Sequence, residues 1–145
     1  MSRAIDTNVL VYARRAETAQ HGQALSLLRT LAEGAEPWGL PWPCVYEFLR
    51  VVTHPRVFHP PTPLGSVLED LRALQESPSV RMLRETDRHA EVMERVLHST
   101  SVSGNLIHDA HIVALLLEHG FDEIVSADSD LRRFPGIRVT NPFGP

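Results

Sequence analysis

The chain has 145 residues, 43% of them hydrophobic and 22% charged, and its formal net charge is −4. These proportions are those of a folded globular domain and exclude a disordered chain, and the negative charge gives no global signal for nucleic-acid binding. No apolar run is long enough to span a bilayer, and charged residues interrupt the apolar stretch near the N-terminus, so we expect neither a membrane partner nor a signal peptide. The single cysteine, Cys44, cannot form an internal disulfide, which favours the reducing cytoplasm. We therefore expect one cytoplasmic domain, residues 1–145.

Predicted strands and helices alternate along the chain. Residues 106–119 form the clearest helix, Thr86 and Asn105 are candidate helix caps, and the proline-rich residues 54–63 are expected to be an exposed loop. The predicted helices are residues 7–13, 19–33, 41–52, 64–76, 87–98 and 106–119, and the predicted strands are residues 3–6, 38–40, 80–83, 123–126 and 137–140. This alternation predicts an α/β fold of three layers, in which helices cover both faces of a short parallel sheet.

Two acidic residues follow predicted strands. Asp6 comes at the end of the first strand, and Asp128 lies just past the strand that ends at Ser126. Ligands of parallel α/β folds bind beyond the carboxyl ends of the strands, so both carboxylates belong to the same functional edge. Each also has a structural alternative, because Asp6 can cap the following helix and Asp128 can form an Asx-turn.

Two further acidic residues lie on predicted helices at positions where an apolar residue is expected. Glu47 is flanked by Cys44 and Val51, although it can also lie at the solvated border of that helix. Asp109 continues an apolar stripe that includes Ile112, and an unpaired buried carboxylate either becomes neutral or binds a cation. Its structural alternative is a favourable interaction with the helix dipole near the helix start.

The histidines next to Asp109 are not assigned as ligands. His108 and His111 are three residues apart, which is not the spacing of the zinc-protease motif, and the glutamate of that motif is missing. Cys44 has no neighbouring catalytic partners in the sequence and is interpreted as a small buried apolar residue.

Taken together and in this order, the acidic residues resemble those of a PIN domain. Such domains carry an aspartate after the first strand, a helical glutamate, an aspartate in a late helix, and a final aspartate after the next strand. The matching residues here are Asp6 in Asp6-Thr7-Asn8, Glu47, Asp109 in His108-Asp109-Ala110-His111, and Asp128 in Ser126-x-Asp128-x-Asp130. The resemblance covers essentially the whole chain, and its length and composition are similar to those of the toxin of a VapBC-type toxin–antitoxin pair.

The resemblance implies a three-layer α/β/α PIN-like fold and a Mg²⁺- or Mn²⁺-dependent endoribonuclease. Asp6 and Asp109 would bind the ion, and Glu47 and Asp128 would bind it through water or assist the attacking nucleophile. The supporting residues would be Asn8, Ser126 and Asp130. The expected partners are an RNA substrate, a second copy of the chain in a homodimer, and a VapB-type antitoxin that inserts an arginine among the carboxylates.

An RNA substrate requires local positive charge on a chain whose net charge is negative. Arg14, Arg15, Arg132 and Arg133 lie close in sequence to two of the acidic residues and are the candidate phosphate contacts. Two alternatives remain open at this point. One is an HD-type metal phosphohydrolase, suggested by His108-Asp109, and the other is a catalytically inactive PIN-like RNA-binding module.

Overall fold

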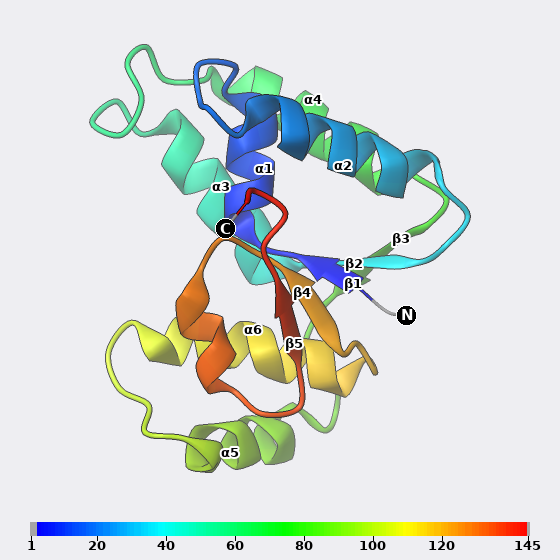
Figure 1. Cartoon of the computed structure of the whole chain (residues 1–145), viewed down its shortest axis with the longest axis vertical. Helices are drawn as coiled ribbons and strands as arrows, with labels where there is room; N and C mark the ends of the chain where they lie inside the picture. The colour runs from blue at the N-terminus through cyan, green and yellow to red at the C-terminus, as the bar shows by residue number, and fades with distance from the viewer. Residues whose placement is uncertain (1–2, 145) are drawn as a thin grey trace.

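The computed structural model describes residues 3–144, which form a five-stranded parallel sheet with helices on both faces (Figure 1). The strands are β1 (Arg3–Ile5), β2 (Trp38–Pro41), β3 (Val80–Leu83), β4 (Glu123–Val125) and β5 (Arg138–Thr140). The helices are α1 (Thr7–Arg14), α2 (His21–Glu33), α3 (Trp42–Thr53), α4 (Leu64–Gln75), α5 (His89–Ser99), α6 (Leu106–Glu118) and the 3-10 helix η1 (Ser129–Arg133). The order across the sheet is β3-β2-β1-β4-β5, and every pair is parallel.

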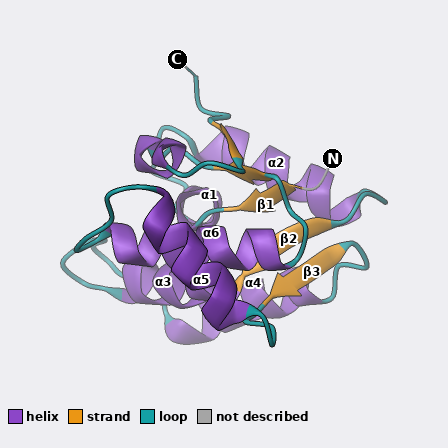
Figure 2. Ribbon diagram, turned by 90° about the horizontal axis from the view of Figure 1, so that it is seen from below, coloured by secondary structure: helices purple, strands orange, loops and turns teal. Residues whose placement is uncertain are grey.

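Successive residues of the central strands point to opposite faces of the sheet and enter two different hydrophobic clusters. Ala4 and Ile124 pack with α5 and α6, whereas Ile5 and Val125 pack with α1, α2, α3 and α4. Figures 1 and 2 show these two groups of helices on either side of the sheet. The prediction of a three-layer α/β fold with a parallel sheet is confirmed.

The fold opens a crevice at the carboxyl end of β1. After β1 the chain adds β2 on one side, whereas β4 lies on the other side, so the strand order reverses at this point. The backbone N–H of Asp6 donates to the carbonyl of Val125 at 3.1 Å, and that of Ser126 donates to Thr140 at 2.9 Å. These bonds hold the residues after β1 and β4 at the switch point, where ligands of open α/β sheets bind.

Some local predictions differ from the structure. Helix α5 begins at His89, because Thr86 forms the preceding turn and accepts from the N–H of Arg88 rather than capping the helix. Asn105 holds the N-cap position of α6, but its side chain makes no capping hydrogen bond. The proline-rich loop is not fully exposed, since Thr62 is buried and donates its N–H to a carbonyl of α3 at 2.8 Å. Among the described residues, no helix has the length and hydropathy needed to cross a membrane.

Candidate active site

The structure brings the four predicted carboxylates together around one pocket of about 320 Å³, here called the carboxylate pocket. Asp6 reaches it from the end of β1, Glu47 from α3, Asp109 from the first turn of α6, and Asp128 from the segment after β4. They are separated by up to 122 positions in the chain and meet because all four segments begin at the carboxyl edge of the sheet or pass over it.

Asp6 is the most firmly held member of the pocket. It is 7% exposed, and its Oδ1 accepts from the backbone N–H of Thr7 at 2.8 Å while its Oδ2 accepts from Ser126 Oγ at 2.6 Å and Asn8 Nδ2 at 3.3 Å. Cys44 Sγ lies 3.6 Å from Oδ1 as a weak fourth donor. Burial raises the pKa of Asp6 above its ordinary value despite these hydrogen bonds.

Ser126 and Asn8 join the two strand ends that carry aspartates. Ser126 Oγ accepts from Asn8 Nδ2 at 3.0 Å and from the backbone N–H of Asp128 at 2.9 Å, while it donates to Asp6. Asn8 Oδ1 accepts from the N–H of Ala127 at 3.2 Å. Asn8 and Ser126, two of the three residues predicted to support the site, therefore fix the position of Asp6 relative to Asp128.

Asp109 has a strongly raised pKa. Burial, followed by the nearby charges of Asp128 and Asp6, raises the pKa of Asp109 to about 6. A carboxylate in such surroundings costs free energy when it is ionised, unless a cation joins the group. The apolar stripe of α6 that Asp109 continues is buried, since Ile112 is 1% exposed and Leu116 is fully buried.

The donor set fits a hard divalent cation. One carboxylate oxygen from each of Asp109, Asp128 and Asp130 lies within 4.8 Å of the others. An octahedral ion with bonds of 2.0–2.1 Å spaces its ligand oxygens by roughly 3 to 4.2 Å, so small side-chain rotations suffice to close this group on an ion. An all-oxygen set is the one that Mg²⁺ and Mn²⁺ prefer. Asp130 was expected only as an auxiliary residue, and the structure places it in this group.

Glu47 is paired within its own helix. Arg50 Nη2 donates to Glu47 Oε1 at 2.5 Å and Arg50 Nε donates to Oε2 at 3.1 Å, and this pairing lowers the pKa of Glu47. Glu47 is therefore ionised at neutral pH and lines the pocket without belonging to the three-oxygen group. Arg50 and Cys44 are contacts that the sequence reasoning missed, although Arg50 lies at the i+3 position where a helical ion pair forms.

The four candidate RNA-binding arginines lie outside the lining of the carboxylate pocket. Arg14 pairs with Asp70 at 3.4 Å. Arg15 donates to Glu17, Thr62 and the carbonyl of Pro60, and its guanidinium lies 4.5 Å from the ring centre of Phe58. Arg132 and Arg133 are exposed on η1, directly after Asp128 and Asp130.

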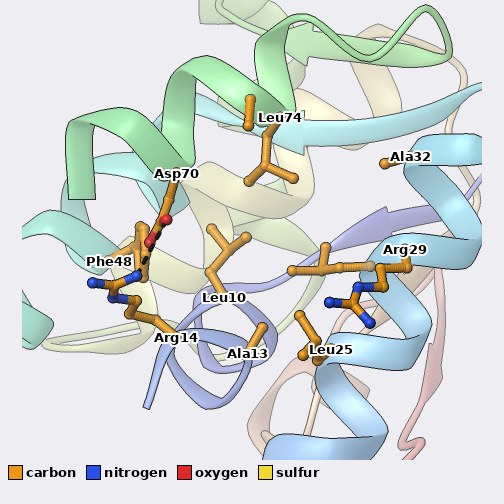
Figure 3. Close-up of a pocket in the computed structure, with 11 residues that line it drawn as sticks. Leu10, Ala13, Arg14, Leu25, Arg29, Ala32, Phe48, Asp70 and Leu74 are labelled. Atoms are coloured by element: carbon orange, nitrogen blue, oxygen red, sulfur yellow. Dashed lines mark hydrogen bonds and ion pairs between the residues drawn. The ribbon is translucent and has the colours of Figure 1, made fainter. Parts of the chain in front are cut away.

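A second pocket of about 320 Å³ lies between α1, α2 and α4 (Figure 3). It is mostly apolar, and the Arg14–Asp70 pair lies at its side. Its apolar lining residues are Leu10, Ala13, Leu25, Leu28, Ala32, Phe48, Ala73 and Leu74. Among the described residues, the charged side chains that line this pocket are Arg14, Arg29 and Asp70, so it lacks the carboxylate grouping of the carboxylate pocket.

The PIN-domain family model matches residues 4–137. The chain is 36% identical over 143 residues to Ribonuclease VapC48 of Mycobacterium tuberculosis, covering 99% of both chains. It is 38% identical over 139 residues to Ribonuclease VapC43 of the same organism, covering 96% of this chain and 94% of the relative. Among solved structures it resembles VapBC2 from Rickettsia felis bound to promoter DNA, with a TM-score of 0.69, 14% identity and coverage of 97% and 98%. It also resembles the toxin VapC20 of M. tuberculosis, with a TM-score of 0.65, 17% identity and coverage of 94% and 98%.

Proposed function

This chain belongs to the PIN-domain family and aligns over nearly its whole length with VapC ribonucleases, and on that premise we propose that it is a metal-dependent endoribonuclease and the toxin of a VapBC-type pair. The observation that carries the proposal is the convergence of Asp6, Glu47, Asp109 and Asp128 on one pocket. We further propose that residues 1–145 are a single PIN domain.

The ion in this proposal is Mg²⁺ or Mn²⁺. Asp109 and Asp128 would hold it directly, with Asp130 beside them and Asp6 as the further ligand from the end of β1. Two observations support this set of ligands. The carboxylates of Asp109, Asp128 and Asp130 are closely grouped, and the nearby charge of Asp6 contributes to the raised pKa of Asp109. When bound, such an ion lowers the pKa of a water and stabilises charge on the scissile phosphate.

The remaining groups act through position and charge. Ser126 and Asn8 orient Asp6 by hydrogen bonds, and Glu47, which pairs with Arg50 and lines the pocket, would accept a proton from the attacking water. An HD-type phosphohydrolase is not favoured, because the PIN-domain family model matches residues 4–137 and the pocket lies at the carboxyl edge of a parallel sheet. An inactive binding module is not favoured either, because the repelling carboxylates are all present.

The proposed partners of this chain are inferred from its structural neighbours. The structural neighbours include VapBC2 bound to a promoter DNA fragment and FitAB bound to a DNA fragment, and on this likeness we propose a cognate VapB-type antitoxin for this chain. An arginine from the antitoxin would match the carboxylate pocket in charge and geometry. We also propose an RNA substrate, a homodimer and a cytoplasmic location.

The proposal predicts that Asp109→Asn and Asp128→Asn each lower Mg²⁺-dependent RNA cleavage by roughly 100-fold or more, because each removes a charged ligand. The measurement is the cleavage rate of a structured RNA by the purified protein. The matched control is Asp122→Asn, an exposed aspartate at the amino end of β4, away from the pocket, and it should retain full activity. Wild-type rates in both pocket variants would contradict the proposal.

A further inference from the structure

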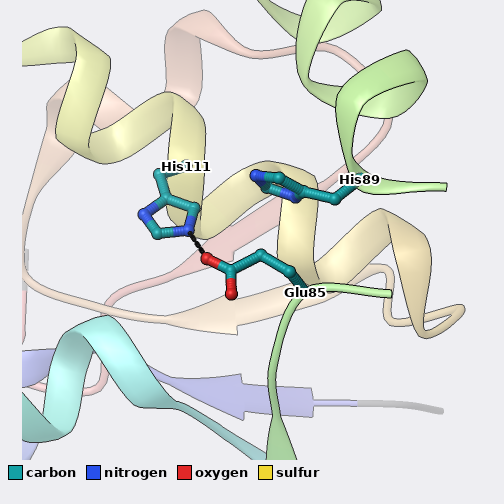
Figure 4. A group of neighbouring side chains, drawn as sticks. All are labelled: Glu85, His89 and His111. Atoms are coloured by element: carbon teal, nitrogen blue, oxygen red, sulfur yellow. Dashed lines mark hydrogen bonds and ion pairs between the residues drawn. The ribbon is translucent and has the colours of Figure 1, made fainter. Parts of the chain in front are cut away.

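A second group of metal-ligating side chains lies outside the carboxylate pocket, and we call it the histidine cluster: Glu85, His89 and His111 (Figure 4). Glu85 follows β3, His89 is the first residue of α5, and His111 lies on α6. One ligand atom from each lies within 4.8 Å of the others. Neither Glu85 nor His89 lines the carboxylate pocket, so the two groups are separate.

A buried carboxylate orients His89 from behind. The side chain of Glu118 is fully buried, its Oε1 accepts from both the N–H and the hydroxyl of Thr86 at 2.8 Å, and its Oε2 lies 2.6 Å from His89 Nδ1. In the neutral ring Nδ1 therefore carries the proton, and Nε2 keeps its lone pair. Figure 4 shows the ring of His89 directed toward His111 and Glu85. A carboxylate that fixes the tautomer of a histidine ligand is the usual second layer of a zinc site.

The other two residues face His89 across a short gap. His111 Nε2 lies 2.8 Å from Glu85 Oε1, and the His89 and His111 ring centres are 5.3 Å apart. A tetrahedral zinc ion with bonds of about 2.0–2.1 Å spaces its ligand atoms by about 3.3 Å. To bind the ion, the 2.8 Å distance between Glu85 and His111 would lengthen slightly and the His89 ring would move closer to both. The side chain of Glu85 is 54% exposed and is therefore free to make this adjustment.

We propose that Glu85, His89 and His111 bind one transition-metal ion of the Zn²⁺ class at a site separate from the carboxylate pocket. Two imidazoles and one carboxylate are a zinc ligand set, whereas the all-oxygen carboxylate pocket suits Mg²⁺ or Mn²⁺. The cluster lines an open pocket of about 570 Å³, which gives the ion a path from solvent and leaves its fourth position for water.

Glu85 and His89 lie four residues apart, in the loop after β3 and at the start of α5, whereas His111 lies on α6, more than 20 positions later. The bound ion therefore cross-links the β3–α5 connection to α6. An ion that binds only the folded protein raises the unfolding temperature in a concentration-dependent way. The site therefore stabilises the α5–α6 layer and takes no part in the proposed cleavage step.

The test is Zn²⁺ titration of the tag-free full chain by calorimetry, with millimolar Mg²⁺ present to occupy the carboxylate pocket. The expected result is one equivalent of bound Zn²⁺ and a rise in the unfolding temperature. His111→Ala and His89→Ala should each weaken binding at least tenfold. Glu118→Gln, which removes the negative charge behind His89 and keeps all three ligands, should weaken it about 10–100-fold. His98→Ala, an exposed histidine of α5, is the matched control and should bind as the wild type does.

Circular dichroism checks that each variant is folded. If His89→Ala does not fold, the Zn²⁺ affinity of His111→Ala tests the proposal. Substitution of Co²⁺ for Zn²⁺ should give the intense visible absorption of a four-coordinate ion in the wild type and lose it in His111→Ala. Structural zinc sites bind far more tightly than at about 100 μM. Absence of Zn²⁺ binding up to this concentration would therefore overturn the proposal. Equal binding by the wild type and a folded His111→Ala, or binding lost only in Asp109→Asn, would overturn it as well.

Discussion

Two aspartates of the carboxylate pocket, when ionised, lower the free energy of unfolding of the metal-free protein. Asp6 and Asp109 both have raised pKa values, chiefly because they are buried, and like charges add to the shift at Asp109. The arrangement is tolerable because a bound cation offsets the repulsion. Groups kept at a cost to stability are typical of functional sites.

This electrostatic cost predicts a pH-dependent effect of Asp109→Asn in metal-free protein. The folded-state pKa of about 6 exceeds the ordinary unfolded value, so the folded state binds the proton more tightly. The destabilisation by Asp109 is therefore complete above pH 6 and disappears as the pH falls toward 4. We expect Asp109→Asn to be more stable than the wild type by on the order of 1 kcal/mol at pH 7.5, after allowance for solvent screening, and nearly equal to it near pH 4.

Thermal unfolding in EDTA across this pH range measures the effect. Asp122→Asn, the exposed control, should show no such pH-dependent difference from the wild type. A metal-free Asp109→Asn that is less stable than the wild type at pH 7.5 would contradict the electrostatic explanation. Binding of Mg²⁺ to the folded wild type should raise its unfolding temperature, and Asp109→Asn should reduce this rise because it removes a ligand.

At the scale of elements, the position of α3 depends on how β2 packs. Strand β2 runs directly into α3, which carries Glu47, and its four residues are all buried. Gly39 lies in the middle of this strand, where a Cβ atom would come within 2.9 Å of Leu83 Cδ1 and 3.0 Å of Phe121 Cε2. The neighbouring strand β3 and the segment before β4 thus approach the backbone of β2 closely.

This close approach predicts that Gly39→Ala destabilises the protein by roughly 1–3 kcal/mol, because two buried side chains must move to admit a methyl group. Gly65→Ala is the matched control, since Gly65 lies in α4 with open space around its Cα, and alanine favours a helix. Urea unfolding should show a lower midpoint for the first variant and an equal or higher midpoint for the second. Equal midpoints for Gly39→Ala and the wild type would show that β2 is loosely packed.

At the scale of the whole molecule, charge distribution decides how a chain of net charge −4 meets RNA. The proposed phosphate contacts differ in their availability. Arg14 and Arg15 are engaged with protein acceptors, whereas Arg132 and Arg133 are exposed on η1 beside the pocket aspartates, and Arg133 approaches Asp130 at 3.9 Å. We therefore propose Arg132 and Arg133 as the principal RNA contacts, and the roles of Arg14 and Arg15 stay predictions.

The double charge reversal Arg132→Glu/Arg133→Glu should weaken RNA binding and make its salt dependence shallower. Loss of two phosphate contacts lowers the slope of log K against log salt by about 1.4 for a single strand. Binding is measured in the Asp109→Asn background, so that the RNA is not cleaved. The control is Arg81→Glu, on β3 at the opposite edge of the sheet from β5. An unchanged slope in the double variant would place the RNA on another surface.

Much of this architecture could be predicted from local patterns. The helical periodicity of 106–119 and the strand at 80–83 agree with α6 and β3 to within one residue, because burial on one face of an element imposes its period on the sequence. The acidic residues at strand ends and on the apolar stripe could also be identified, since a carboxylate at such a position conflicts with its surroundings. The predicted roles of all four carboxylates remain predictions, although all four line the pocket.

The sequence by itself determined the α/β layers, the functional edge and the residues that carry negative charge there. Only the tertiary structure decided their partners: Cys44 donates to Asp6, Arg14 pairs with Asp70, and His89 faces His111 with Glu118 behind it. These contacts join residues 22 to 56 positions apart, and they depend on the rotation of each helix and the rotamer of each side chain. Local periodicity sets which face of an element is buried, whereas the partner that meets a side chain across the core is set by the packing of the whole chain.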